Sequence, residues 1–220
     1  MFDQIAPRYD LLNRLMSLGM DGAWRRRLLD AVGAPSALLD LATGTADVAI
    51  AAARRFPGAA VVGLDPSSQM LRLGAAKLAG AGLGSRISLL EGDAQELPFA
   101  SGRFDAVTIA FGIRNVPDRP RALREMRRVL RRGGRLGILE LGEPADGAFV
   151  GPSRLYIHRL VPALGKLLSS EEEYRYLSRS IAAFPRAVEF AKTVAEAGFG
   201  DVGVKRLMAG AVHVFSGIVP

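Results

Sequence analysis

Short apolar runs alternate with helical patterns through the middle of the chain. The apolar runs predict strands at residues 37–42, 59–65, 86–93, 104–111 and 135–141. Between them, apolar positions recur at helical spacing and predict helices over Val48–Arg55, Ser67–Leu78 and a stretch that begins at Arg119. We expect the last of these helices to end at Gly133–Gly134, because glycine commonly follows a helix C-terminus.

This alternation predicts an α/β fold, a Rossmann-like, mostly parallel sheet with helices on both faces. After a helix at Ala187–Ala197, the strands at 201–207 and 209–219 follow one another without a helix between them. They predict an antiparallel hairpin at one edge, which brings the sheet to seven strands.

Two segments lie outside the alternation. Residues 1–35 predict helices before the first strand, and residues 145–184 predict a mostly helical insertion. Additions of this kind commonly cover the ends of strands and close a site, so we expect two lid segments. The chain is then one domain over 1–220, with a cofactor-binding core at 36–144 and the last helix and edge strands at 185–220.

Composition limits the class of protein. A chain of 220 residues with 49% hydrophobic content can bury a substantial core. No apolar run reaches the roughly 18 residues of a membrane-spanning helix, and the N-terminus does not read as a secretory signal, so we expect a cytoplasmic protein. The absence of cysteine excludes thiolate chemistry, and with two histidines no metal site is expected.

The net charge of +7 is concentrated between Arg119 and Arg135, where eight arginines accompany one glutamate. Apolar residues recur at helical spacing in this stretch, which favours a solvated face of an amphipathic helix. Contact with an anionic membrane surface is the second interpretation. Nucleic acid is the weakest, since no stacking aromatic residues are interleaved with the arginines.

A cofactor site is indicated where three predicted strands end. "DLATGTADVAI" passes from a strand through Gly44 into a helix, an arrangement that lets the backbone approach an anionic ligand. About twenty residues later Asp65 ends the second strand, where a carboxylate can accept both hydroxyls of a ribose. Asp93 and Ala94 follow the third strand, where a side-chain acceptor and a backbone amide can read an adenine edge.

The loop holds one glycine and so lacks a dinucleotide fingerprint. An adenosine ligand without pyrophosphate, S-adenosylmethionine, fits this pattern; helix caps and turns are the structural alternative.

The fourth predicted strand ends in "IAFGIRNV", which delivers Arg114 and Asn115 just where the chain leaves the sheet. Because open α/β sheets bind ligands beyond the carboxyl ends of their strands, these residues are candidates for a reaction site. The alternative is a polar surface loop in which Arg114 pairs with an acid and has only a structural role.

With these motifs the sequence resembles the ubiquinone/menaquinone biosynthesis C-methyltransferases, a family of class I S-adenosylmethionine-dependent enzymes. The resemblance runs along nearly the whole chain. It rests on "FDQIAPRYDLLNRLMSLGMDGAWRR", "DLATGTADVA", "GDAQELPF", "TIAFGIRNV" and "EEYRYLSRSIAAFP".

The resemblance implies a polyprenylated quinol that is methylated on a ring carbon. It also implies cofactor-binding residues, which are Gly44, Thr45, Asp65, Asp93, Ala94 and the backbone of Ala110. Arg114 is expected to stabilise the phenolate that forms on the acceptor ring, and Asn115 to orient the hydroxyl or a water. Candidate substrate residues lie in the two lid segments and are Tyr9, Asp10, Tyr156, His158, Tyr174 and Tyr176.

Two departures from the family pattern bear on the site. Ala46 stands where the family usually has glycine, and a positive φ there would strain the backbone by about 1 kcal/mol or more. Phe215 stands at the family's histidine position, while His213 lies two residues earlier on the same face of the strand.

Several questions stay open from the sequence. The acceptor can be a demethylmenaquinol or a methoxy-benzoquinol. Alternative functions are a small-molecule or RNA methyltransferase of the same fold, and a non-catalytic methyltransferase-like subunit. A homodimer and peripheral membrane contact are also open.

Overall fold

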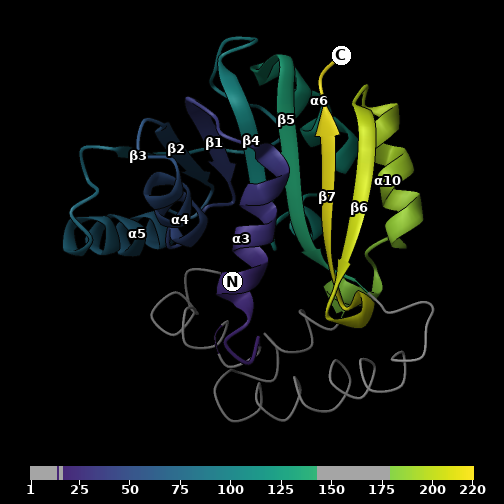
Figure 1. The fold of residues 1–220 in the computed structure, drawn as a ribbon, viewed down its shortest axis with the longest axis horizontal. Coiled ribbons are helices and arrows are strands. Elements are labelled where there is room, and N and C mark those ends of the chain that lie inside the picture. The colour runs from purple at the N-terminus through teal and green to yellow at the C-terminus, as the bar shows by residue number, and fades with distance from the viewer. Residues whose placement is uncertain (1–13, 15–16, 143–178) are drawn as a thin grey trace.

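The structure is a computed structural model, and it describes residues 14, 17–142 and 179–220. Its centre is a seven-stranded sheet in the order β3-β2-β1-β4-β5-β7-β6. The parallel strands are β1 (Ala37–Leu41), β2 (Ala60–Asp65), β3 (Ile87–Glu91), β4 (Phe104–Ala110) and β5 (Leu130–Leu141). An antiparallel pair, β6 (Gly200–Leu207) and β7 (Val212–Ile218), completes one edge (Figure 1). The predicted α/β fold and edge hairpin are confirmed.

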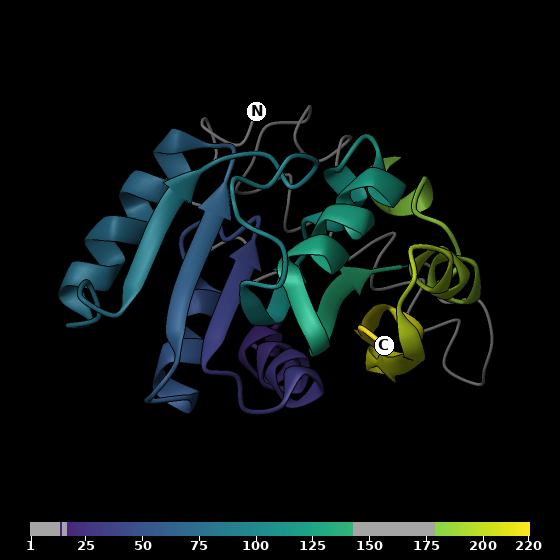
Figure 2. The same ribbon diagram turned by 90° about the horizontal axis from the view of Figure 1, so that it is seen from above.

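Helices cover both faces of the sheet, as Figures 1 and 2 show. On one face lie α3 (Asp21–Val32), α4 (Asp47–Arg55) and α5 (Ser68–Gly80), and on the other lie α6 (Arg119–Val129) and α10 (Ala187–Glu196). Alternate residues of the central strands therefore enter two separate apolar clusters. Leu38 of β1, for example, packs beneath the first group of helices, and its neighbour Leu39 beneath the second.

The helical predictions that fall on the described residues hold with one correction. We expected the arginine-rich helix to continue to Gly133–Gly134, but α6 ends at Val129. Leu130 already has extended backbone and pairs with Phe104 of β4. The glycines lie in β5 and are hydrogen-bonded to the residue that follows β7, since Gly133 N donates to Val219 O and Val219 N donates to Gly134 O. Strand pairing outcompetes the helix at this point.

None of the helices in residues 17–142 or 179–220 combines the length and hydropathy that crossing a bilayer requires. The candidate substrate residues Tyr9, Asp10, Tyr156, His158, Tyr174 and Tyr176 lie outside the described residues, as does most of the predicted 145–184 insertion.

Helix α3 is positioned by a close approach to β5. A Cβ atom placed on Gly137 would come within 2.9 Å of side-chain methyls of both Leu28 and Val32. The absence of a side chain at this one position lets the helix lie directly on the strand.

We predict that Gly137→Ala lowers the free energy of unfolding by about 1–3 kcal/mol, because the added methyl overpacks this contact. Urea denaturation measures the change. Gly58→Ala is the matched control, since a Cβ at Gly58 meets nothing within 4 Å. Equal effects of the two substitutions would contradict this description of the packing.

Candidate active site

The loops that leave β1 and β4 meet at the carboxyl edge of the sheet. These strands are neighbours at the position where the strand order reverses direction, the usual ligand site of open α/β sheets. A Cβ atom on Gly112, in the loop after β4, would come within 2.5 Å of the Cβ of Ala42, in the loop after β1. Ala42 and Phe111 both have left-handed backbone, with φ of 47° and 55°. The edge of Trp24 on α3 packs against Phe111, with ring centroids 6.2 Å apart.

The loop after β1 is hydrogen-bonded to the end of β2. Gly44 N donates to Asp65 Oδ2 at 2.8 Å, and Ser67 N donates to Asp65 Oδ1 at 2.9 Å. Asp65 is buried, and its carboxylate therefore joins two of the segments in which the sequence predicted cofactor contacts.

Ala46 has the positive φ that the sequence analysis identified as a source of backbone strain. Its φ is 68° and its ψ 23°, at the N-cap position of α4, and the residue is fully buried. A left-handed conformation costs an L-residue about 1–2 kcal/mol. A glycine would take this conformation without strain, whereas here an alanine holds it.

Ion pairs fix the start of α4 from two sides. Lys77 Nζ of α5 donates to Asp47 Oδ1 at 2.6 Å and to Thr45 Oγ1 at 3.0 Å. Arg25 Nη2 of α3 lies 3.0 Å from Asp47 Oδ2, and Arg25 also pairs with Asp21. Thr45 is buried, and its hydroxyl is engaged with Lys77.

Beneath this loop, Asp40 of β1 is a buried acid that the sequence analysis did not single out. Thr43 Oγ1 donates to one of its oxygens at 2.7 Å, and Thr108 Oγ1 of β4 donates to the other at 2.8 Å. Burial raises the pKa of Asp40 from 3.8 to about 7, although the two hydroxyls and the charge of Arg25 oppose the shift.

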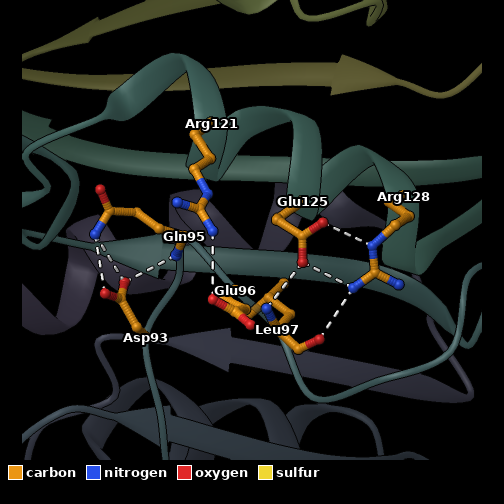
Figure 3. Close-up of polar contacts among 7 residues, drawn as sticks. All are labelled: Asp93, Gln95, Glu96, Leu97, Arg121, Glu125 and Arg128. Carbon is orange, nitrogen blue, oxygen red and sulfur yellow. Dashed lines mark hydrogen bonds and ion pairs between the residues drawn. The ribbon is translucent and has the colours of Figure 1, made fainter.

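The turn after β3 is attached to α6, as Figure 3 shows. Asp93 is exposed and Ala94 is buried. Further along the turn, Leu97 N donates to Glu125 Oε2 at 2.8 Å, and Arg128 donates to Leu97 O and to Phe99 O. The Arg128 guanidinium also binds Glu125 and holds the pKa of that carboxyl below its usual value.

Arg114 lies in a short 3-10 turn after β4, Ile113–Asn115, and forms a buried ion pair with Glu140 of β5. Its Nη1 donates to Glu140 Oε1 and to Phe111 O, both at 2.6 Å. The side chain of Arg114 is 9% exposed and that of Glu140 is 0% exposed. Within the described part of the chain, Arg114 Nε is the one buried side-chain nitrogen or oxygen that has no hydrogen-bond partner.

Glu140 also organises the backbone of the site, since it accepts from Arg114 N at 3.2 Å and from Leu141 N at 2.8 Å. On the other side of the turn, Arg119 of α6 donates to Arg114 O at 2.9 Å and to Ile113 O. The conformation of the Arg114 turn is thus fixed from both β5 and α6.

Two further candidates occupy nearby positions. Asn115 is half-buried at the end of the 3-10 turn, and its N–H donates to Gly112 O. Ala110 is the last residue of β4 and pairs with Leu139 of β5. The side chains of Ala110 and Leu139 lie on one face of the sheet, whereas that of Glu140, the partner of Arg114, lies on the other.

The histidine departure can also be placed. His213 of β7 lies opposite Glu140 of β5 and opposite Arg206 of β6. Burial, together with the charge of Arg206, lowers the pKa of His213 to about 4. Phe215 is on the same face, as expected, and its ring packs against Phe190 of α10 with centroids 4.9 Å apart. An apolar core position has therefore replaced the family's usual histidine.

The structure brings most of the predicted site residues to one edge of the sheet, on the loops after β1, β2, β3 and β4. Sequence reasoning missed three residues that hold these loops, namely Asp40, Glu140 and Gln95, whose side-chain amide donates to Asp93 in the turn after β3. The available signal for two of them was an acid inside an otherwise apolar strand, in "ALLDL" and in "LGILEL".

We predict that Asp40→Asn changes the pH dependence of stability in a defined direction. The folded state holds the Asp40 proton up to about pH 7, whereas an unfolded chain releases it near pH 3.8. This contribution is therefore full below pH 3.8 and is lost as pH rises to about 7, by on the order of 4 kcal/mol. Asp40→Asn should remove that decline, as measured by urea unfolding from pH 4 to pH 8.

Asp105→Asn is a control of opposite sign. Arg131 lowers the pKa of Asp105, so this acid stabilises the fold at neutral pH and ceases to do so as pH falls. A decline between pH 4 and pH 7 that persists unchanged in Asp40→Asn would contradict the assignment.

Comparison with known proteins agrees with this geometry. Residues 1–219 match the model of the ubiE/COQ5 methyltransferase family. A demethylmenaquinone methyltransferase of Thermus thermophilus is 49% identical over 97% of this chain and 98% of its own length. A ubiquinone/menaquinone biosynthesis C-methyltransferase of Syntrophotalea carbinolica is 45% identical over 99% and 92%.

Solved structures show the same fold at lower identity. A putative S-adenosylmethionine-dependent methyltransferase of Methanococcus maripaludis is 17% identical, with a TM-score of 0.74 over 100% of this chain and 94% of that one. Phosphoethanolamine N-methyltransferase 2 of Haemonchus contortus, in complex with S-adenosylmethionine, has a TM-score of 0.68 at 17% identity over 89% and 52%. The chain belongs to the ubiE/COQ5 methyltransferase family and is an S-adenosylmethionine-dependent methyltransferase.

Proposed function

We propose that this enzyme methylates a ring carbon of a polyprenylated quinol, converting a demethylmenaquinol to a menaquinol. Relatives that are 40–49% identical over nearly their whole length are named demethylmenaquinone methyltransferase or ubiquinone/menaquinone biosynthesis C-methyltransferase. Within the molecule, the supporting observation is the buried guanidinium of Arg114, whose Nε–H has no hydrogen-bond partner among the described residues.

The residues at the carboxyl edge of the sheet fit S-adenosylmethionine. In this proposal Asp65 accepts from the ribose hydroxyls and Asp93 from the adenine amino group. The loops after β1 and β4 pack closely against each other, because Gly112 carries no side chain where it meets Ala42. Bound there, S-adenosylmethionine supplies an electrophilic methyl group with a good leaving group. The protein's own residues then have to orient the acceptor and exclude water.

Arg114 acts on the acceptor oxygen. An aromatic carbon becomes a strong nucleophile when the neighbouring hydroxyl loses its proton, and a phenol has a pKa near 10 in water. The Nε–H of Arg114 donates to this oxygen and favours the phenolate, an interaction of about 2–4 kcal/mol for a preorganised donor. Arg114 itself is not the base, since arginine keeps its proton in proteins.

Glu140 determines how Arg114 performs this role. The pair leaves little net charge at the site, so Arg114 contributes a directed hydrogen bond in place of an isolated cation. Two hydrogen bonds to Nη1 hold the side chain in place before the acceptor arrives. Asn115, next in the turn, orients the hydroxyl or a water that takes the proton.

The polyprenyl tail of the substrate is apolar and partitions into a bilayer. A cytoplasmic enzyme that acts on its ring must therefore contact the membrane surface. Exposed arginines of α6, such as Arg124 and Arg127, supply positive charge for anionic lipids. A homodimer stays a prediction.

We predict that Arg114→Lys lowers kcat by about tenfold to a hundredfold while the affinity for S-adenosylmethionine changes little. A lysine can still neutralise buried Glu140 and so preserves the fold, but it cannot pair with Glu140 and donate to the acceptor in the same geometry. Arg114→Ala is less informative, since removing one partner of a buried ion pair costs about 3–5 kcal/mol of stability.

Turnover is measured with labelled S-adenosylmethionine and either a demethylmenaquinol or a methoxy-benzoquinol, which also shows which ring is methylated. Arg119→Lys is the control, because Arg119 supports the same turn through the Arg114 and Ile113 carbonyls. An equal loss of kcat in both variants would assign Arg114 a scaffolding role. Methylation of neither quinol by the wild-type enzyme would overturn the proposed substrate class.

A further inference from the structure

The side chain of Gln95 joins the adenine-side turn to the start of α6. Its Nε2 donates to both oxygens of Asp93, at 3.1 Å to Oδ1 and 2.9 Å to Oδ2 (Figure 3). Its Oε1 accepts from Asp118 N at 3.0 Å, at the N-cap of α6. An amide fits this position because one of its ends must donate and the other must accept. A glutamate could accept from Asp118 but would repel Asp93.

The contacts make the two oxygens of Asp93 unequal. Oδ1 receives two hydrogen bonds, from Gln95 N at 2.8 Å and from Gln95 Nε2. Oδ2 receives one, from Gln95 Nε2. A carboxylate oxygen accepts about two hydrogen bonds, so Oδ2 keeps an acceptor position and Oδ1 does not. Asp93 is exposed, and among the described residues its carboxylate is hydrogen-bonded only by Gln95, which therefore orients it.

We infer that Gln95 is a positioning residue that turns Asp93 Oδ2 toward the 6-amino group of the adenine and so sets the preference for adenosine over inosine. The inference rests on the cofactor site and not on the identity of the methyl acceptor. Gln95 acts only through Asp93 and does not itself touch the ligand.

Through its Oε1, Gln95 also contacts Asp118, which lies in the segment that follows the Arg114–Asn115 turn. Asp118 stands three residues after Asn115, and it also caps α6 by accepting from Arg121 N at 2.9 Å. Neighbouring contacts, from Glu125 and Arg128 to Leu97 and Phe99, hold the same turn on the helix. The turn therefore keeps its place when Gln95 is changed, and the orientation of Asp93 is the property that is lost.

The test is the ratio of two dissociation constants, measured calorimetrically for S-adenosylhomocysteine and for its deaminated analogue, S-inosylhomocysteine. The analogue presents a carbonyl oxygen to Asp93 where adenine presents an amino donor. Gln95→Met removes both amide hydrogen bonds without adding charge, and Gln95→Glu keeps the size while repelling Asp93. We expect either substitution to weaken S-adenosylhomocysteine about threefold to tenfold and the analogue much less, so that the ratio shrinks.

Glu96→Gln is the matched control. The Glu96 side chain is 85% exposed and pairs with Arg121 at 3.3 Å without touching the Asp93 carboxylate, so the ratio should stay at its wild-type value. A general loosening of the turn would weaken both ligands in parallel. An unchanged ratio in Gln95→Met would therefore overturn the inference. The assay contains no quinol, so a failure of the proposed acceptor would not alter its result.

Discussion

The buried ion pair between Arg114 and Glu140 is the interaction on which the arrangement of the site depends. It joins the turn after β4 to the last residues of β5, two segments that are 26 positions apart in the chain. Removing two charges from water is costly, and the cost is recovered only where the geometry is good and the remaining polar atoms are satisfied. Glu140 meets this condition with backbone donors from Arg114 and Leu141. Arg114 does not meet it fully, because its Nε is left without a partner, and an incomplete buried network of this kind points to a ligand.

Backbone strain is concentrated in the same place. Ala42, Ala46 and Phe111 all have left-handed backbone, and each lies in a loop at the carboxyl ends of β1 and β4. Conformations of this kind persist where the surrounding structure determines them, and they are common at functional sites. Here the surrounding structure is the Asp40 hydrogen-bond network below the loop and the ion pairs of Asp47 beside it. The supports of these strained loops thus come from the sheet and from α3 and α5.

Local patterns in the sequence were sufficient for the sheet and for most of the helices. Asp65 and Asp93 could be assigned to one edge because parallel strands end on the same side, a rule that needs no knowledge of contacts. The end of α6 could not be predicted, because it depends on the pairing of Leu130 with Phe104 of β4. The helical spacing of apolar residues contains no information about that distant contact. The distant contacts of Glu140 and Gln95 were missed for the same reason, since Arg114 lies 26 residues from Glu140 and Asp118 lies 23 residues from Gln95. Arg114 lies at the predicted edge of the sheet, and its pairing with an acid is the structural alternative that the sequence left open, although the identity of that acid, Glu140, was not foreseen. The role of Arg114 at the acceptor ring stays a prediction.

We propose that Arg114, held by Glu140, presents Nε–H to the oxygen of the acceptor ring. A crystal structure of the enzyme with S-adenosylhomocysteine and a demethylmenaquinol analogue can decide this. We expect the ring oxygen to lie within hydrogen-bonding distance of Arg114 Nε while Nη1 stays on Glu140. A ring oxygen bound elsewhere, with Arg114 Nε paired to another protein group, would contradict it.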